Sequence, residues 1–156
     1  MFFLLFCISA GFADTSSENG GFWISLSPET ALYSYSGVSF GGGLSLGYGK
    51  GTTIGLKTAW FYNSTGVSVL EINILYRIYF SSRKAYSGSF LQFLGGPALF
   101  FGKEDELSFP AKTGAFSVGV GYGWRFLIKD LWYVEPSVRV GFPYMVGAGI
   151  SAGMRF

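Results

Sequence analysis

The sequence contains no histidine, and its one cysteine is Cys7. This excludes a disulfide framework and a thiolate or imidazole metal site, and it leaves no imidazole to act as a general base. Charged residues are also scarce, at 13% of the chain against about 25% in a typical soluble domain. The net charge of +2 is too small and too scattered for a nucleic-acid-binding protein. We therefore predict a non-enzymatic chain with no catalytic residues, no cofactor and no metal site, and with no nucleic-acid partner.

Long hydrophobic runs are absent as well. Residues 1–13 are almost entirely apolar and end in Gly11-Phe12-Ala13, but a membrane-spanning helix needs about 20 such residues. The small residues Gly11 and Ala13 occupy the positions that a secretory cleavage site requires. A lipoprotein signal at Cys7 is disfavoured because bulky Phe6 stands where a small residue should precede a lipidated cysteine. We predict a signal peptide over 1–13 and one domain over 14–156.

Along much of the chain, bulky apolar residues alternate with small or polar ones. The clearest case is Tyr144 to Phe156, in which every second residue belongs to one of two faces, as in a β-strand. One face is apolar and consists of Val146, Ala148, Ile150, Ala152, Met154 and Phe156. The other face is small with a single charge and consists of Gly147, Gly149, Ser151, Gly153 and Arg155. A small, glycine-lined face is suited to the crowded interior of a narrow barrel.

Seven further segments alternate in the same way. The eight predicted strands cover residues 22–26, 38–49, 52–62, 67–80, 89–101, 113–126, 132–142 and 144–156. Residues 27–37 blur the end of the first segment, and we interpret them as a loop. The spacing and the short turns predict an all-β fold, an eight-stranded antiparallel up-and-down β-barrel.

The distribution of charges indicates which face is inside. All seven charges that lie within predicted strands fall on the small, glycine-rich face: Lys57, Glu71, Arg77, Arg125, Glu135, Arg139 and Arg155. The bulky face has none, and its aromatics gather at strand ends: Tyr48, Trp60, Tyr62, Phe80, Trp124, Phe126, Trp132, Phe142 and Phe156. This is the pattern of a transmembrane barrel with an apolar band between two aromatic girdles. A lipocalin-like soluble barrel is the alternative, but it would expose a wall of Gly and Ser carrying seven charges.

With these features, residues 22–156 resemble the small eight-stranded outer-membrane barrels of diderm bacteria, the group of the OmpA transmembrane domain, OmpX and OmpW. The ending on Met154 and Phe156 resembles the C-terminal signal that the barrel assembly machinery reads, although Ser151 replaces its usual glycine. The resemblance implies a multi-pass protein of the cell outer membrane whose partners are outer-membrane lipids and that machinery. It also implies that both chain ends lie in the periplasm, and that 27–37, 63–66, 103–112 and 142–144 face outside.

One segment of the chain matches a known catalytic motif. Gly149 to Gly153 matches G-x-S-x-G, the nucleophile elbow of serine hydrolases, but that motif needs a strand-to-helix turn and a histidine. The lipid A acyltransferase and deacylase barrels, which the chain resembles in strand number, use a histidine as base. The sequence therefore predicts no hydrolase.

The charged residues of the lumen are the remaining candidate site. Hairpin counting predicts that Lys57 faces Glu71 and that Arg125 lies directly or diagonally beside Glu135. Arg77, Arg139 and Arg155 would then share these two acids, bond to other polar groups or face lumen water. With five basic residues against two acidic ones, a path through the lumen would favour anions or the polar end of an amphiphile.

Two functions remain open. The leading hypothesis is a non-enzymatic integral outer-membrane protein for envelope integrity and surface interaction, with a possible host or environmental surface ligand. The alternative is an OmpW-like narrow channel for small hydrophobic or anionic solutes, with the charged residues lining its path.

Overall fold

The computed structural model describes residues 20–34, 36–80, 87–102, 112–128 and 131–156. It contains eight strands: β1 Gly21–Tyr33, β2 Gly37–Gly49, β3 Thr52–Tyr62, β4 Ser68–Tyr79, β5 Gly88–Phe101, β6 Lys112–Ile128, β7 Trp132–Phe142 and β8 Tyr144–Arg155. Among the described residues, no helix is long and apolar enough to cross a membrane. The predicted signal peptide at 1–13, most of residues 81–88 between two predicted strands, and most of the predicted outer loop at 103–112 lie outside the described residues.

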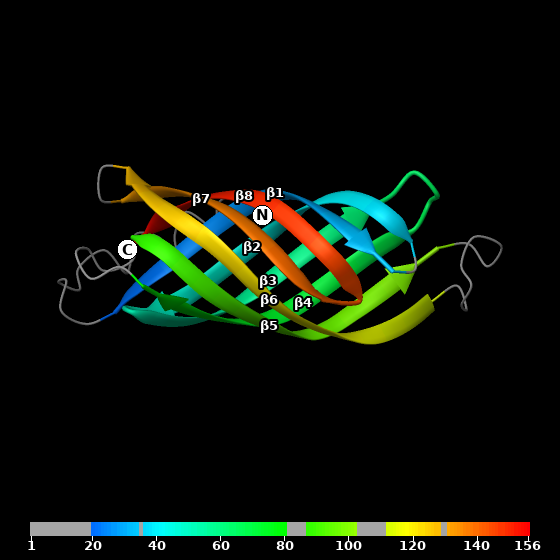
Figure 1. Cartoon of the computed structure of the whole chain (residues 1–156), viewed down its shortest axis with the longest axis horizontal. Coiled ribbons are helices and arrows are strands. Elements are labelled where there is room, and N and C mark those ends of the chain that lie inside the picture. The colour runs from blue at the N-terminus through cyan, green and yellow to red at the C-terminus, as the bar shows by residue number, and fades with distance from the viewer. Residues whose placement is uncertain (1–19, 35, 81–86, 103–111, 129–130) are drawn as a thin grey trace, which may run out of the picture.

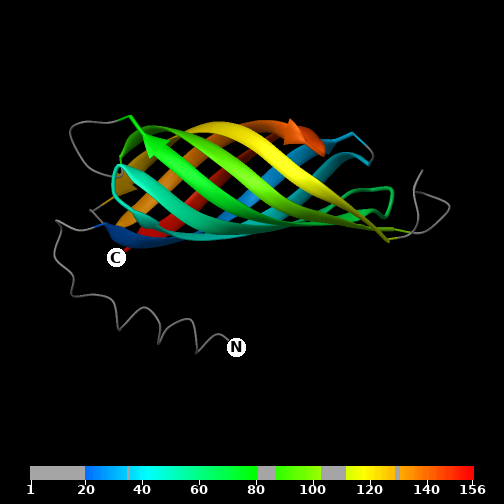
Figure 2. The same ribbon diagram turned by 90° about the horizontal axis from the view of Figure 1, so that it is seen from below.

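The strands form a closed barrel in chain order, as predicted (Figure 1). All neighbours are antiparallel, and β1 closes the barrel against β8 through pairs such as Ile24 with Met154. The strands are strongly tilted around the barrel, as the two side views show (Figure 2). We call the end where β1 begins and β8 ends the terminal end, and the opposite end the distal end.

Alternation places the bulky apolar residues on the outer wall. Ile74 is 62% exposed, Leu46 45% and Trp124 45%, whereas the intervening Leu75 and Ser45 are buried. The predicted girdle aromatics from Tyr48 to Phe142 are also exposed on this wall, and Phe156 is partly buried. The inside-out orientation predicted from the charge distribution is therefore present in the structure.

Glycines on the inner face make room for large lumen side chains. A Cβ atom at Gly47 would lie 2.6 Å from the ring of Trp23, and one at Gly153 would lie 2.5 Å from the ring of Tyr133. Both rings are 1% exposed, so the lumen is packed around them. This explains why the small face of each strand is rich in glycine.

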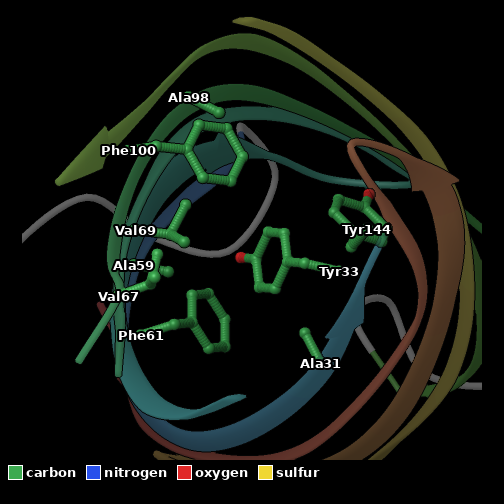
Figure 3. Close-up of a cluster of buried hydrophobic side chains, with 9 residues drawn as sticks. All are labelled: Ala31, Tyr33, Ala59, Phe61, Val67, Val69, Ala98, Phe100 and Tyr144. Atoms are coloured by element: carbon green, nitrogen blue, oxygen red, sulfur yellow. The ribbon is translucent and has the colours of Figure 1, made fainter. Parts of the chain in front are cut away.

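The distal end of the lumen holds an aromatic cluster. Tyr33 extends across the interior toward the opposite wall, with Phe61, Phe100 and Tyr144 around it (Figure 3). The ring of Tyr33 makes edge contacts with these three rings at centroid distances of 5.6, 6.0 and 6.3 Å. Since all four side chains are at most 4% exposed, they fill this part of the lumen.

Three distal turns are connected to one another by hydrogen bonds. The Asn63 side chain accepts from the backbone N–H groups of Thr65 and Val67 and donates to the carbonyl of Ser36. Both the backbone N–H and the hydroxyl of Ser34 donate to the carbonyl of Pro143, at 3.1 and 3.2 Å. These bonds fix the β1–β2, β3–β4 and β7–β8 turns into one distal rim.

The main error of the sequence interpretation concerns the first strand. β1 continues to Tyr33, so residues 27–33 are strand and not loop. Polar Ser27 and Glu29 point inward and are buried, while Pro28 and Thr30 stand on the outward positions. Inward and outward residues still alternate in this segment. However, Ser27 and Glu29 on the inner face are polar, and Pro28 and Thr30 on the outer face are not bulky, so the segment has the composition of a loop. Proline is tolerated at Pro28 at the cost of one ladder hydrogen bond.

Candidate functional site

Six of the seven predicted lumen charges are buried inside the barrel. Their exposed fractions range from 0 to 6%, for Lys57 on β3, Glu71 and Arg77 on β4, Arg125 on β6, and Glu135 and Arg139 on β7. The seventh, Arg155, is partly buried at the terminal end of β8. An eighth charge, Glu29 on β1, is buried with them and was missed because its segment was interpreted as a loop.

Glu29 changes the charge balance of the lumen. The buried set contains four bases and three acids, in place of the five bases and two acids predicted for the whole lumen. The signal that could have revealed Glu29 is its position: continuing the alternation from Trp23 and Ser25 places it on the inner face. These seven residues form two separate charge groups.

The distal charge group consists of Glu29, Lys57, Glu71 and Arg139. Lys57 Nζ lies 2.5 Å from Glu29 Oε1, and Arg139 Nη2 lies 3.6 Å from Glu29 Oε2. Arg139 Nη1 also bonds to Glu71 Oε2 at 2.7 Å. The four residues come from β1, β3, β4 and β7, so these ion pairs tie walls that share no ladder hydrogen bonds.

Neutral polar groups complete the coordination of the distal carboxylates. Tyr33 donates its hydroxyl proton to Glu71 Oε1 at 2.7 Å, and Asn73 donates to Glu71 Oε2 at 3.4 Å. Ser27 donates to Glu29 Oε1 at 2.5 Å. The distal charge group therefore has two acids, two bases and a partner for each carboxylate oxygen, which is what burial of ions requires.

The terminal charge group consists of Arg77, Arg125 and Glu135. Arg77 Nη1 lies 3.0 Å from Glu135 Oε2, and Arg125 Nε lies 2.5 Å from Glu135 Oε1. Arg77 Nε also donates to Gln92 Oε1 at 3.2 Å. One carboxylate thus serves two guanidinium groups that are 3% and 0% exposed at residue level.

Aromatic rings surround the buried guanidinium groups. Arg125 Cζ lies 3.9 Å from the ring centroid of Tyr133, Arg139 Cζ lies 4.0 Å from that of Tyr144, and Arg77 Cζ lies 4.7 Å from that of Trp23. Such cation–π contacts stabilise a desolvated cation by about 2 kcal/mol. They help the terminal charge group to hold two guanidinium groups with one carboxylate.

One predicted ion pair is confirmed and one is wrong. The β6–β7 register, with Gly123 opposite Ser137 and Phe126 opposite Val134, places Arg125 opposite Glu135, and the two form an ion pair. In the β3–β4 register, however, Lys57 faces Asn73 and Ala59 faces Glu71. The register is two residues from the one we assumed, which preserves the faces and changes the partners.

The other predicted partners are revised accordingly. Lys57 pairs with Glu29 across β1 and β3, and Glu71 pairs with Arg139 across β4 and β7. Arg77 shares Glu135 with Arg125, while Arg139 contacts two carboxylates. No local sequence pattern specifies these contacts, because they cross the lumen.

The arrangement resembles no catalytic constellation. Ser151 of the G-x-S-x-G match lies within β8 opposite Glu135, in regular strand and not in a turn. Within the described ranges, no three His, Cys, Asp or Glu residues are grouped to hold a metal ion. What these charges do chemically is neutralise one another and link the walls of the barrel.

Comparison with known proteins shows similarity in fold but not in sequence family. No family model matches it, and neither does any curated protein. Among solved structures it is similar to the N-terminal β-barrel domain of Pseudomonas aeruginosa OprF, with TM-score 0.55 and 14% identity, over 88% of this chain and 99% of that one. It is also similar to Neisserial surface protein A, with TM-score 0.53 and 14% identity, over 87% of this chain and 95% of that one. The chain therefore has the fold of the small eight-stranded outer-membrane β-barrels.

Proposed function

We propose that this chain is a non-enzymatic integral protein of the outer membrane of a diderm bacterium. The observation that carries the proposal is the outer wall, an exposed apolar surface that surrounds a charged interior. Soluble proteins rarely expose apolar patches of more than a few hundred Å², and this one encircles the barrel. Each strand has at least 11 residues, and a tilted transmembrane strand needs about 9 to 11.

We further propose that its roles are envelope integrity and surface interaction. The filled lumen supports these roles over the narrow channel, because two charge groups and an aromatic cluster occupy the interior. The distal rim supports a role in surface contact, since its hydrogen-bonded turns present a preorganised backbone that a host or environmental ligand could recognise. The barrel assembly machinery would insert the chain through β8, and the predicted signal peptide would export it.

Membrane placement is tested by substitution on the outer wall. Ile74→Arg should destabilise the barrel by about 2 to 4 kcal/mol in phospholipid vesicles if Ile74 lies near the midplane of the bilayer. The control is Ser45→Ala on the buried inner face, which introduces no charge. Equal losses for the two variants in urea unfolding would contradict the lipid-facing assignment.

The role itself is tested by deletion and by conductance. A strain lacking the protein should become permeable to detergents and large antibiotics and should lose adhesion to its surface ligand, with unchanged uptake of small solutes. Purified barrel in planar bilayers should give no steady conductance. Lost solute uptake with an intact envelope and normal adhesion, together with conductance, would support the narrow channel instead.

A further inference from the structure

The outer wall has two adjoining hollows. The first, of about 720 Å³, extends from β2 across β1, β8 and β7 to β6. The second, of about 700 Å³, extends from β1 across β2 to β3. Because Pro28 on β1 lines both, the hollows meet there, and we call the two together the wall trough. The wall trough therefore crosses the strands, from β3 through the β1–β8 closure to β6.

Strand register aligns one row of outward residues along the wall trough. In order, the row consists of Trp60, Gly42, Pro28, Ile150, Pro136 and Trp124. Two of its steps, Pro28 to Ile150 and Pro136 to Trp124, follow from the adjacent pairs Glu29–Gly149 and Gly123–Ser137. Glycine has no side chain and proline has a short, flat ring. The row is therefore low between the two exposed tryptophans at its ends.

Bulkier apolar side chains border the wall trough. Phe40, 68% exposed, and Leu26, 65% exposed, stand on opposite sides of the row, and Tyr122 borders its β6 end. Among the described residues that line it, Glu29 alone is charged, and its side chain is turned into the lumen against Lys57. The wall trough therefore offers an occupant mainly hydrocarbon contacts and no charge.

The length and slope of the wall trough match one hydrocarbon chain. Five steps between neighbouring strands, at about 4.8 Å each, give about 24 Å from Trp60 to Trp124. Trp60 lies two residues from the distal end of β3, and Trp124 lies four residues from the terminal end of β6. Because transmembrane strands tilt by about 35 to 45°, a row across them slopes at about 50° to the barrel axis and covers about 15 Å of depth. This is half of a hydrocarbon core about 30 Å thick, which is the depth of one leaflet.

We propose that the wall trough binds one acyl chain of a membrane lipid, lying across the strands between Trp60 and Trp124. The site rests on the proposed membrane location, because only there does the bilayer surround the outer wall. A flexible hydrocarbon chain can follow an uneven apolar floor and needs no hydrogen bonds. A second copy of the barrel fits less well, because association inside a bilayer depends on close packing or on hydrogen bonds between partners. Phe40 and Leu26 stand above the floor and would hold a second convex barrel away from it.

Lipid retention tests the proposal on the native chain. The wild-type barrel in detergent micelles, supplied with one equivalent of a phosphatidylethanolamine with 16- and 18-carbon chains, should retain one lipid molecule in native mass spectrometry. A wild-type barrel that retains no lipid under conditions that keep it folded would overturn the proposal. A dimer in place of a lipid complex would overturn it in favour of a second copy. This measurement needs no variant.

A pair of matched variants tests whether the retained lipid lies in the wall trough. Gly42→Phe fills the floor and should abolish retention, whereas Gly95→Phe adds the same ring to an outward glycine on β5 and should leave retention unchanged. Both positions accept a side chain, because a Cβ atom would lie 3.3 Å from its nearest neighbour at Gly42 and 3.9 Å at Gly95. Equal retention by the two folded variants would contradict the proposal.

Tryptophan fluorescence locates the chain along the wall trough. Three variants keep the buried Trp23 and only one tryptophan of the outer wall, Trp60, Trp124 or Trp132, with Phe at the other two positions. In micelles titrated with a phosphatidylcholine brominated in mid-chain, Trp60 and Trp124 should be quenched in a saturable manner, and the unbrominated lipid should compete. Trp132, which does not line the wall trough, should be quenched less. Equal, linear quenching of all three would overturn the proposal.

Insertion of the wild-type barrel into phosphatidylcholine vesicles, measured in parallel, separates this site from the proposed function. A barrel that inserts but shows no saturable quenching would overturn the acyl-chain site alone. A barrel that does not insert would overturn the membrane location and, with it, the site.

Discussion

The two charge groups solve the same physical problem with different redundancy. In the distal charge group, Arg139 contacts two carboxylates, and Glu71 is also bonded by Tyr33 and Asn73, so the loss of one contact leaves others. In the terminal charge group, Glu135 alone serves two arginines. From this difference we expect that the burial of a charged residue alone does not set how much stability is lost when the residue is replaced. The number of alternative partners that remain should matter more.

The largest effect is expected at Glu135. Glu135→Gln leaves Arg77 and Arg125 without a carboxylate and should lower the free energy of unfolding by about 3 to 5 kcal/mol, the usual cost of breaking a buried ion pair. The measurement is urea unfolding of the barrel in phospholipid vesicles, with linear extrapolation to zero denaturant. A smaller loss of unfolding free energy than that of the matched variant Glu71→Gln would contradict the view that the terminal charge group is the less redundant one.

A smaller loss is expected for Glu71→Gln itself. Arg139 keeps its contact with Glu29, and the new amide oxygen can still accept from Tyr33, so the cost should be about 1 to 3 kcal/mol. The same unfolding experiment gives the value. Unfolding of the chain under native conditions would show that Glu29 does not compensate Arg139.

A double-mutant cycle sharpens the partner assignment within the distal charge group. Lys57→Met and Glu29→Gln should show a coupling free energy of about 1 to 2 kcal/mol, because the two charges are in direct contact. The cycle of Lys57→Met with Glu71→Gln should give a smaller value, since no ion pair joins them. A larger coupling free energy between Lys57 and Glu71 than between Lys57 and Glu29 would support the Lys57–Glu71 pair that hairpin counting predicts.

The smallest effect is expected at Tyr33. Tyr33→Phe removes one hydrogen bond to Glu71 but keeps the ring in its aromatic cluster, so the loss should be about 1 kcal/mol. In the Glu71→Gln background the same substitution should cost less, because the charge that strengthens the bond is gone. Equal losses in both backgrounds would mean that the hydroxyl acts independently of Glu71.

Much of the fold could be predicted from the sequence because a strand reports its two faces directly. In β2, β3 and β7, bulky residues alternate with Gly, Ser or charges, and the structure places these elements within one residue of the predicted bounds. The same signal fails in residues 27–33, where Pro28 and Thr30 replace bulky outward residues. Glu29 was lost from the predicted site for that reason.

The sequence by itself determined the strand number and, outside residues 27–33, which side chains point inward, because the period of two is local and because charge is costly on a lipid-facing wall. Only the tertiary structure decided the ion-pair partners of Lys57, Glu71 and Glu29. A register shift of two residues leaves every face unchanged, so the sequence could not distinguish Asn73 from Glu71 as the neighbour of Lys57. The contacts of Glu29 with Lys57 and of Glu71 with Arg139 cross the lumen between non-adjacent strands, and they follow from barrel closure and tilt, which no local pattern encodes.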